Sequence, residues 1–297
     1  MFRGCGTAMI TPFAANGSLD EATLRRLVRR QVDAGIHFLV PCGTTGESPT
    51  LTHEEHLRVV EITLEEAQGR VPVVAGCGGY STTKIIALAA ELEAMGVDGL
   101  LSVTPYYNRP TPDGLYQHYA ALAGSTRLPI ILYNVPGRTA CNVTPDLLCR
   151  IATIDNIVAV KEASGNIGQM AAVCQTVPSD FAVLSGDDAV TLPLMALGGM
   201  GIISVVSNEI PAEMAQLCEY AFAGDFGQAR ELHRRVYPLM AVNFCETSPG
   251  PVKVGMEMMG LIEANFRLPM VRPRPASCDQ VGAVLEKLGL LQAVTVS

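Results

Sequence analysis

The 297-residue sequence lacks several patterns, and each absence excludes a class of protein. Its nine cysteines stand singly, with no CxxC pair and no Cys/His spacing typical of zinc, so we predict neither a disulfide framework nor a metal site. No window contains the run of about 18 apolar residues that a membrane helix needs. The first residues also lack the long apolar region of a secretion signal. We therefore expect a cytoplasmic protein that does not enter a membrane.

Basic residues are fewer than acidic ones, which argues against a nucleic-acid partner. The chain has 21 Lys and Arg against 29 Asp and Glu, a formal net charge of -8. One basic cluster, Arg25-Arg26 with Arg29-Arg30, has helical spacing, and we interpret it as a solvated helix face. Because 48% of the residues are hydrophobic, the chain can fill the core of one large barrel or of two ordinary domains.

Eight short apolar runs, each followed by an amphipathic segment, predict alternating strands and helices. The predicted strands are 6–11, 38–42, 71–75, 99–103, 129–133, 157–161, 181–185 and 201–206. Helices are predicted at 19–34 and 52–68, for example, and Thr52 with Glu55 forms a capping-box pattern at the start of the second. Eight such units fit a closed parallel (β/α)8 barrel, the TIM barrel, better than an open sheet.

The pattern changes after the eighth unit. From about residue 225 the sequence predicts helices without strands, including an amphipathic stretch at 279–291, and the proline-rich link 268–275 interrupts them. We therefore predict a catalytic barrel domain at 1–224 and a helical C-terminal domain at 225–297.

Lys161 places an ammonium at the end of the apolar run 157–161, which otherwise predicts a fully buried strand. Such a group is costly to remove from water unless it is paired or used. Two interpretations stay open. Lys161 forms a structural ion pair with the adjoining Glu162, or it is a neutral amine of depressed pKa that attacks a carbonyl to form a Schiff base.

Polar residues follow several other predicted strands, at the end where barrel enzymes build their sites. Thr44 and Thr45, between glycines, suit an anion such as a carboxylate, or form an ordinary turn. The Tyr133 ring packs in the half-buried core, or its phenol relays protons. Arg138 binds a carboxylate substrate, or it forms a surface ion pair. For the glycines at 198–201 we favour a tight turn or close backbone approach over a phosphate site.

Five motifs together resemble one enzyme family. They are GTTGE at 43–47, YNVPGRT at 133–139, VKEASG at 160–165, SGDD at 185–188 and GGMGIIS at 198–204. In order and spacing, over almost the whole chain, they are similar to the dihydrodipicolinate synthase family, also called 4-hydroxy-tetrahydrodipicolinate synthase. This family belongs to the pyruvate-dependent class I aldolases.

The resemblance implies the reaction and its residues. Lys161 would form an imine with pyruvate, whose carboxylate is held by Thr44 and Thr45. The enamine would attack the aldehyde of L-aspartate 4-semialdehyde to give 4-hydroxy-tetrahydrodipicolinate, the committed step of diaminopimelate and lysine biosynthesis. Tyr133 would relay protons with Thr44 and Tyr107, the last from a neighbouring subunit of a homotetramer.

By the same resemblance, Arg138 would bind the carboxylate of the semialdehyde, and Gly186 and Ile203 would line the pyruvate pocket through backbone groups. It implies no metal and no organic cofactor, since the lysine itself provides the electron sink. Two alternatives remain: a lyase for N-acetylneuraminate or another 2-keto sugar acid, which would keep Lys161 and Tyr133, and a non-catalytic sensor. Arg138 favours a short substrate with a carboxylate over a sugar polyol.

The sequence departs from the family pattern at three positions. Ser248 replaces the asparagine of an Asn-Pro-x-Pro-x-Lys segment, which puts any contact carried over to that side chain in doubt. Tyr80 and Lys84 replace an Asn and a Glu that receive lysine in lysine-inhibited relatives. We therefore predict weak or absent inhibition by L-lysine.

Overall fold

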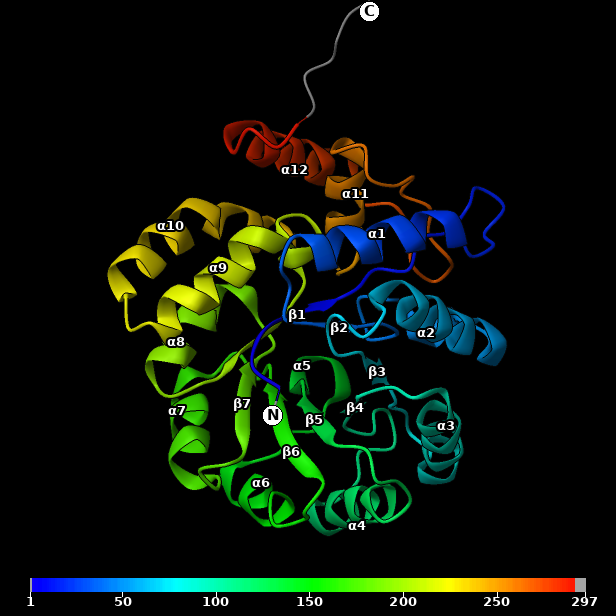
Figure 1. Ribbon diagram of the computed structural model, residues 1–297, viewed down its shortest axis with the longest axis vertical. Helices are drawn as coiled ribbons and strands as arrows, with labels where there is room; N and C mark the ends of the chain where they lie inside the picture. The colour runs from blue at the N-terminus through cyan, green and yellow to red at the C-terminus, as the bar shows by residue number, and fades with distance from the viewer. Residues whose placement is uncertain (1, 292–297) are drawn as a thin grey trace, which may run out of the picture.

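The computed structural model describes residues 2–291, and within them eight parallel strands alternate with helices as a TIM barrel does (Figure 1). The strands are β1 Gly4–Ala8, β2 Phe38–Val40, β3 Val74–Gly76, β4 Gly99–Val103, β5 Ile130–Asn134, β6 Ile157–Glu162, β7 Ala182–Ser185 and β8 Gly201–Ser204. Their order in the sheet is β2-β1-β8-β7-β6-β5-β4-β3. A parallel bridge between Leu39 and Val73 joins its two ends, so the barrel is nearly closed.

Most predicted strands differ from the observed ones by a few residues, because side chains and prolines end the ladders. The first strand begins earlier than predicted, since the Gly4 N–H donates to the Met200 carbonyl at 2.8 Å. It ends earlier too, because the Ile10 N–H donates to the Asn208 side chain at 3.1 Å instead of to a strand. Pro72, which has no N–H, delays the third strand.

Helices form the outer layer of the barrel and its C-terminal extension. They are α1 Glu21–Asp33, α2 His53–Ala67, α3 Thr82–Met95, α4 Pro112–Ala123, α5 Pro136–Thr139, α6 Pro145–Ile151, α7 Ile167–Thr176, α8 Thr191–Ala196, α9 Pro211–Phe222, α10 Phe226–Val242, α11 Gly250–Met258 and α12 Pro275–Lys287. The predicted capping box at the start of α2 is present: the Thr52 hydroxyl accepts from the Glu55 N–H, and the Glu55 carboxylate accepts from the Thr52 N–H.

Alternation along the strands divides the apolar side chains into two cores. The inner core fills the barrel and includes Ile131, Tyr133, Ala159, Leu184 and Ile203. The outer core lies between strands and helices and includes residues next to these in sequence, such as Leu132, Val160 and Ile202. In β6, Ala159 faces inward and Val160 outward, so the alternation directs Lys161 into the barrel.

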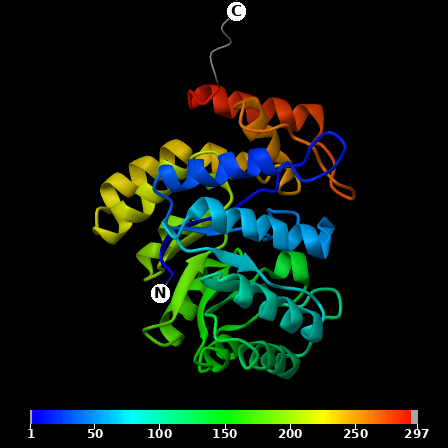
Figure 2. The same ribbon diagram turned by 45° about the vertical axis from the view of Figure 1, so that its right-hand side comes forward.

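The C-terminal helices α10, α11 and α12 share the outer core with the barrel. Leu232, Val236, Met256, Val281 and Leu285 belong to the same apolar cluster as the barrel residues. Figure 2 shows α11 and α12 beyond α1, at the outer edge of the molecule. The boundary between a barrel domain at 1–224 and a helical domain at 225–297 stays a prediction. Residues 292–297 of the second domain lie outside the described residues.

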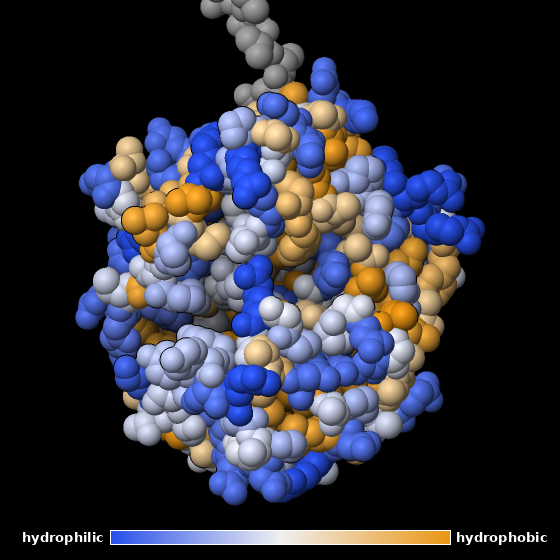
Figure 3. Space-filling model, turned by 180° about the vertical axis from the view of Figure 1, so that it is seen from behind, coloured by the Kyte–Doolittle hydropathy of each residue, from blue (hydrophilic) through white to orange (hydrophobic). Residues whose placement is uncertain are grey.

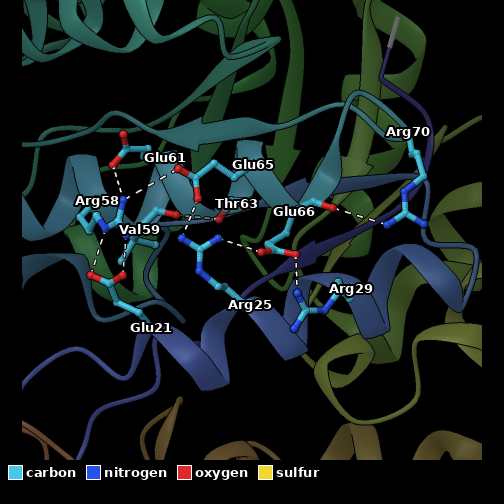
Figure 4. Close-up of polar contacts among 10 residues, drawn as sticks. All are labelled: Glu21, Arg25, Arg29, Arg58, Val59, Glu61, Thr63, Glu65, Glu66 and Arg70. Carbon is cyan, nitrogen blue, oxygen red and sulfur yellow. Dashed lines mark hydrogen bonds and ion pairs between the residues drawn. The ribbon is translucent and has the colours of Figure 1, made fainter.

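The prediction of a solvated face for the arginines of α1 holds for Arg26 and Arg29, which are exposed, whereas Arg25 and Arg30 are half-buried. Arg25 and Arg29 both pair with Glu66 of α2, each at 2.7 Å (Figure 4). Arg30 is partly buried and donates to the Glu209 main-chain carbonyl at 2.6 Å. Acidic residues of α2 and a loop carbonyl therefore bind three of the four guanidinium groups, and local spacing does not reveal partners so far along the chain.

Candidate active site

Lys161 lies near the carboxyl-terminal end of β6, paired with Tyr133 of β5 in the register of the two strands. Its side chain is only 4% exposed, and its Nζ lies 4.3 Å from the centre of the Tyr133 ring. Burial lowers the pKa of Lys161 to about 8, a shift that the charge of Asp188 opposes and that of Arg138 reinforces. A substantial fraction of the amine is therefore neutral near neutral pH, as attack on a carbonyl requires.

The ion-pair interpretation of Lys161 is wrong, because Glu162 faces the other side of the strand. Its carboxylate accepts from Asn134 Nδ2 at 2.9 Å and from the Ser164 N–H at 2.8 Å. Lys161 forms no salt bridge with any residue in the range 2–291. The lysine is left with an aromatic face beside it and no carboxylate bound to it.

The turn after β2 presents Thr44 and Thr45 without using their hydroxyls as caps. Main-chain bonds close it: the Gly46 N–H donates to the Gly43 carbonyl and the Glu47 N–H to the Thr44 carbonyl, both at 3.1 Å. Thr45 is buried and Thr44 is half-buried. Thr44 lines the cavity described below, and its hydroxyl lies near the Tyr133 phenol, whereas Thr45 is not among the residues that line this cavity.

Tyr133 combines a buried ring with a phenol close to polar groups. Burial raises the pKa of Tyr133, while the charge of Arg138 and the Thr44 hydroxyl oppose that rise. The ring belongs to the inner core, so packing and proton relay are compatible roles of one side chain. The phenol stays protonated at neutral pH and can donate or pass on a proton.

Arg138 lies on the short helix α5 and lines a cavity of about 320 Å³ with Thr44 and Tyr106. Its Nη2 donates to the Ser248 main-chain carbonyl at 3.4 Å, and no salt bridge of Arg138 occurs among the described residues. The surface ion-pair interpretation is therefore wrong. Because the contact at position 248 uses the main chain, serine in place of the family's asparagine leaves it intact.

Gly186 directly follows β7, and Ile203 lies within β8. A Cβ at Gly186 would lie 2.6 Å from the Ala163 Cβ and 3.1 Å from the Lys161 Cε, so only glycine leaves room there. Ile203 is fully buried in the inner core. The glycine run 198–201 instead leads into the start of β8, at the opposite end of the barrel. There Gly201 packs on the Gly4 main chain, which supports close backbone approach.

Of the predicted site residues, Thr44 and Arg138 line this cavity, whereas Lys161, Tyr133, Thr45, Gly186 and Ile203 are not among its lining residues. Tyr107 does not line it either. It is 93% exposed and has φ 71°, in the left-handed region that a tyrosine rarely adopts. Its neighbour Tyr106 lines the cavity instead. The chain therefore presents Tyr107 outward.

Asp188 is a buried carboxylate whose position the sequence reasoning missed, although the SGDD motif contains it. It accepts from the Ser204 hydroxyl at 2.5 Å and from the Val205 N–H at 3.1 Å, and burial raises its pKa to about 6. Its charge favours the ammonium form of Lys161. The signal available in the sequence was a second acidic residue after a buried strand.

A second cavity of about 390 Å³ adjoins the first and contains the two other departures from the family pattern. Tyr80 and Lys84 line it, and Tyr106 borders both cavities. The Tyr80 and Tyr106 rings meet edge to face, with centroids 5.6 Å apart. His53, also in this cavity, contacts Glu91 at 2.9 Å.

Among residues 2–291, no group of three or more His, Cys, Asp or Glu side chains is placed to hold a metal ion. In the same range no helix is both long and apolar enough to cross a bilayer.

The sequence and the architecture both match a known family. The model of the Dihydrodipicolinate synthetase family matches residues 1–288. The chain belongs to this family. It is 50% identical over 296 residues to the 4-hydroxy-tetrahydrodipicolinate synthase of Koribacter versatilis, covering 99% of each chain.

Solved structures of dihydrodipicolinate synthases have the same fold. The enzyme of Aquifex aeolicus is 43% identical, with a TM-score of 0.96 over 98% of this chain and 100% of that one. The chloride-inhibited enzyme of Acinetobacter baumannii, in complex with pyruvate, is 39% identical, with a TM-score of 0.96 and the same coverage. The prediction of a TIM barrel with C-terminal helices is confirmed.

Proposed function

We propose that the chain is a 4-hydroxy-tetrahydrodipicolinate synthase, a lyase that condenses pyruvate with L-aspartate 4-semialdehyde through a Schiff base. The reaction is the committed step of diaminopimelate and lysine biosynthesis. The observation that carries the proposal is a buried Lys161, with a pKa of about 8, beside Tyr133 at the inner end of β6. A non-catalytic sensor would need neither a nucleophile nor a proton relay.

In this reaction the Lys161 amine attacks the pyruvate carbonyl, and Tyr133 passes protons during loss of water. Thr44 and Thr45 hold the pyruvate carboxylate, while Gly186 and Ile203 line the pocket through backbone groups. The protonated imine draws electrons from the neighbouring methyl group, so the reaction requires no metal or organic cofactor. The resulting enamine carbon forms the bond to the aldehyde.

Arg138 selects the acceptor, and its removal tests the proposed function. The Arg138→Ala variant should lose on the order of 1.5–3 kcal/mol in kcat/KM for the semialdehyde, since a charged hydrogen bond to carboxylate is lost. Labelling by pyruvate and borohydride should persist. A coupled assay with the semialdehyde measures the effect, and Arg234→Ala, on the exposed face of α10, is the matched control.

An Arg138→Ala variant that keeps full activity with the semialdehyde would favour the alternative, a lyase for N-acetylneuraminate or another 2-keto sugar acid. The same assay run with N-acetylneuraminate separates the two. The synthase is expected to leave this sugar acid uncleaved, because a guanidinium at the acceptor site suits a carboxylate better than a polyol.

The proposed enzyme is a cytoplasmic homotetramer, a dimer of dimers in which Tyr107 reaches the partner's Tyr133 and Thr44. The outward position and left-handed backbone of Tyr107 support this assembly. Exposed apolar side chains are also present on other elements, including Ile167 and Leu197, and Figure 3 shows apolar patches on one face of the molecule.

Inhibition by L-lysine should be weak or absent, with half-inhibition above about 1 mM, equivalent to roughly 4 kcal/mol of binding. Lys84 in the second cavity repels the α-ammonium of lysine, by up to roughly 4 kcal/mol at ~4 Å before screening. An inhibition titration at neutral pH measures it. The Lys84→Glu variant should become more sensitive, because this exposed position then attracts the ammonium. Half-inhibition of the unmodified enzyme well below millimolar would contradict the prediction.

A further inference from the structure

Lys253 is a second buried ammonium, and the proposed reaction does not use it. It lies on α11, and the Lys253 and Glu47 side chains are 0% and 1% exposed. Its Nζ donates to Glu47 Oε1 at 2.7 Å, to the Asn265 carbonyl at 2.6 Å and to the Thr11 carbonyl at 3.3 Å. Three acceptors match the three N–H bonds of the charged form, although burial lowers the pKa of Lys253.

Aromatic rings surround the rest of this ammonium. The Phe13 ring centre lies 4.6 Å from Nζ and the Phe266 ring centre 4.9 Å, and both stabilise a cation. The ends of four separate segments therefore meet at Lys253: the loop after β1, the turn after β2, α11 and the loop before α12. None of these contacts gives the ammonium access to a substrate.

Glu47 connects this ion pair to the Thr44–Thr45 turn. Glu47 has φ 53°, a left-handed conformation that costs a non-glycine residue about 1 kcal/mol or more. In this conformation its N–H donates to the Thr44 carbonyl at 3.1 Å and closes the turn, while its own carbonyl accepts from the Thr50 N–H at 3.0 Å. The turn's shape therefore depends on a strained residue that something must hold.

The side chain of Glu47 is held by Lys253 alone among the described residues. Its Oε1 accepts from Lys253, and its Oε2 is buried without a partner in that range. An ion pair with one unsatisfied carboxylate oxygen adds little net stability, because loss of hydration offsets the attraction. Its clearest effect is geometric, since it fixes Glu47 and with it the turn.

We propose that Lys253 is a positioning residue for the carboxylate of the ketoacid: through Glu47 it holds the Thr44–Thr45 turn in its ligand-binding shape. The inference rests on the proposed function, in which that turn binds the pyruvate carboxylate. It also assigns a role to the C-terminal helices, which supply this support from outside the barrel.

The Glu47→Gln/Lys253→Met double variant tests the proposal without leaving a lone buried charge. Thermal unfolding first compares its stability with that of the unmodified enzyme. Borohydride labelling of Lys161 is then titrated with pyruvate and with methyl pyruvate, whose ester carries no charge. The pyruvate concentration for half-maximal labelling should rise about tenfold, the effect of a weakened charged hydrogen bond, and that of methyl pyruvate should stay unchanged.

Two further variants complete the test. Glu47→Gln alone keeps an oxygen acceptor for Lys253. It should raise the pyruvate concentration for half-maximal labelling roughly two- to threefold and leave that of methyl pyruvate unchanged. Glu257→Gln removes a different ion pair of α11, with Arg272, and should change neither value. Equal rises for both ketones in the folded double variant, or no rise for pyruvate, would overturn the positioning role.

The same titration separates this inference from the proposed function. If pyruvate does not label the unmodified enzyme, the proposed function fails, and the positioning role fails with it. If pyruvate labels the unmodified enzyme and the ratio between the two ketones is the same in the double variant, only the positioning role fails.

Discussion

The Lys161→Arg variant should lose nearly all synthase activity and all labelling by pyruvate and borohydride. A guanidinium stays protonated at any assay pH and cannot form the imine. The unmodified enzyme should gain one reduced pyruvate per chain at Lys161, because borohydride traps only the imine. Peptide mass spectrometry after labelling measures both. Lys287→Arg, at the exposed end of α12, is the matched control and should behave like the unmodified enzyme.

The rate of labelling should rise with pH until the pH passes the pKa of Lys161, and then level off. Burial lowers this pKa to about 8, so the neutral amine increases as the pH rises toward 8 and levels off above it. At pH 7 about a tenth of the amine is neutral, against well under a thousandth for an ordinary lysine. Label on another residue, or a rate that keeps rising to pH 10, would contradict this assignment.

Local sequence patterns predicted the barrel, because each strand and helix leaves its own periodic signal. Apolar runs and capping residues are read from neighbouring positions, as the capping box of Thr52 and Glu55 illustrates. The end of β1 could not be read this way. Asn208, almost two hundred residues away, takes the Ile10 N–H and stops the ladder.

The candidate site was predictable to the extent that strand ends converge in a barrel. Thr44, Lys161 and Gly186 follow or end different strands, and closure of the sheet brings those ends together. The support from Ser248 and Lys253 was not predictable from spacing, since both come from the C-terminal helical region and contact Arg138 and Glu47 over long sequence separations. No local period encodes such contacts.

Tyr133→Phe should slow imine formation by about 10²-fold or more, within the range for lost acid–base catalysis. Phenylalanine keeps the ring beside Lys161 and removes only the phenol. The rate of pyruvate labelling, measured by stopping samples with borohydride over time, gives the effect directly. A folded Tyr133→Phe variant that is labelled at the rate of the unmodified enzyme would show that the phenol is not part of the relay.

Tyr119→Phe is the matched control for this loss of a buried phenol. The Tyr119 hydroxyl donates to the Ser102 carbonyl at 3.0 Å in the outer core, away from Lys161. Its removal should reduce the free energy of unfolding by about 1 kcal/mol and leave the labelling rate unchanged. A difference between the two variants therefore separates chemistry from packing.

The Thr44 hydroxyl should act with the Tyr133 phenol as one relay, because together with the charge of Arg138 it opposes the rise in the phenol's pKa, and it does so as a hydrogen-bond partner. If so, Thr44→Val and Tyr133→Phe each break the same proton path. The double variant should then be slowed little more than Tyr133→Phe alone, which is the non-additivity expected of interacting residues. Fully additive losses in the labelling rate would mean that Thr44 acts through the carboxylate of pyruvate and not through the proton relay.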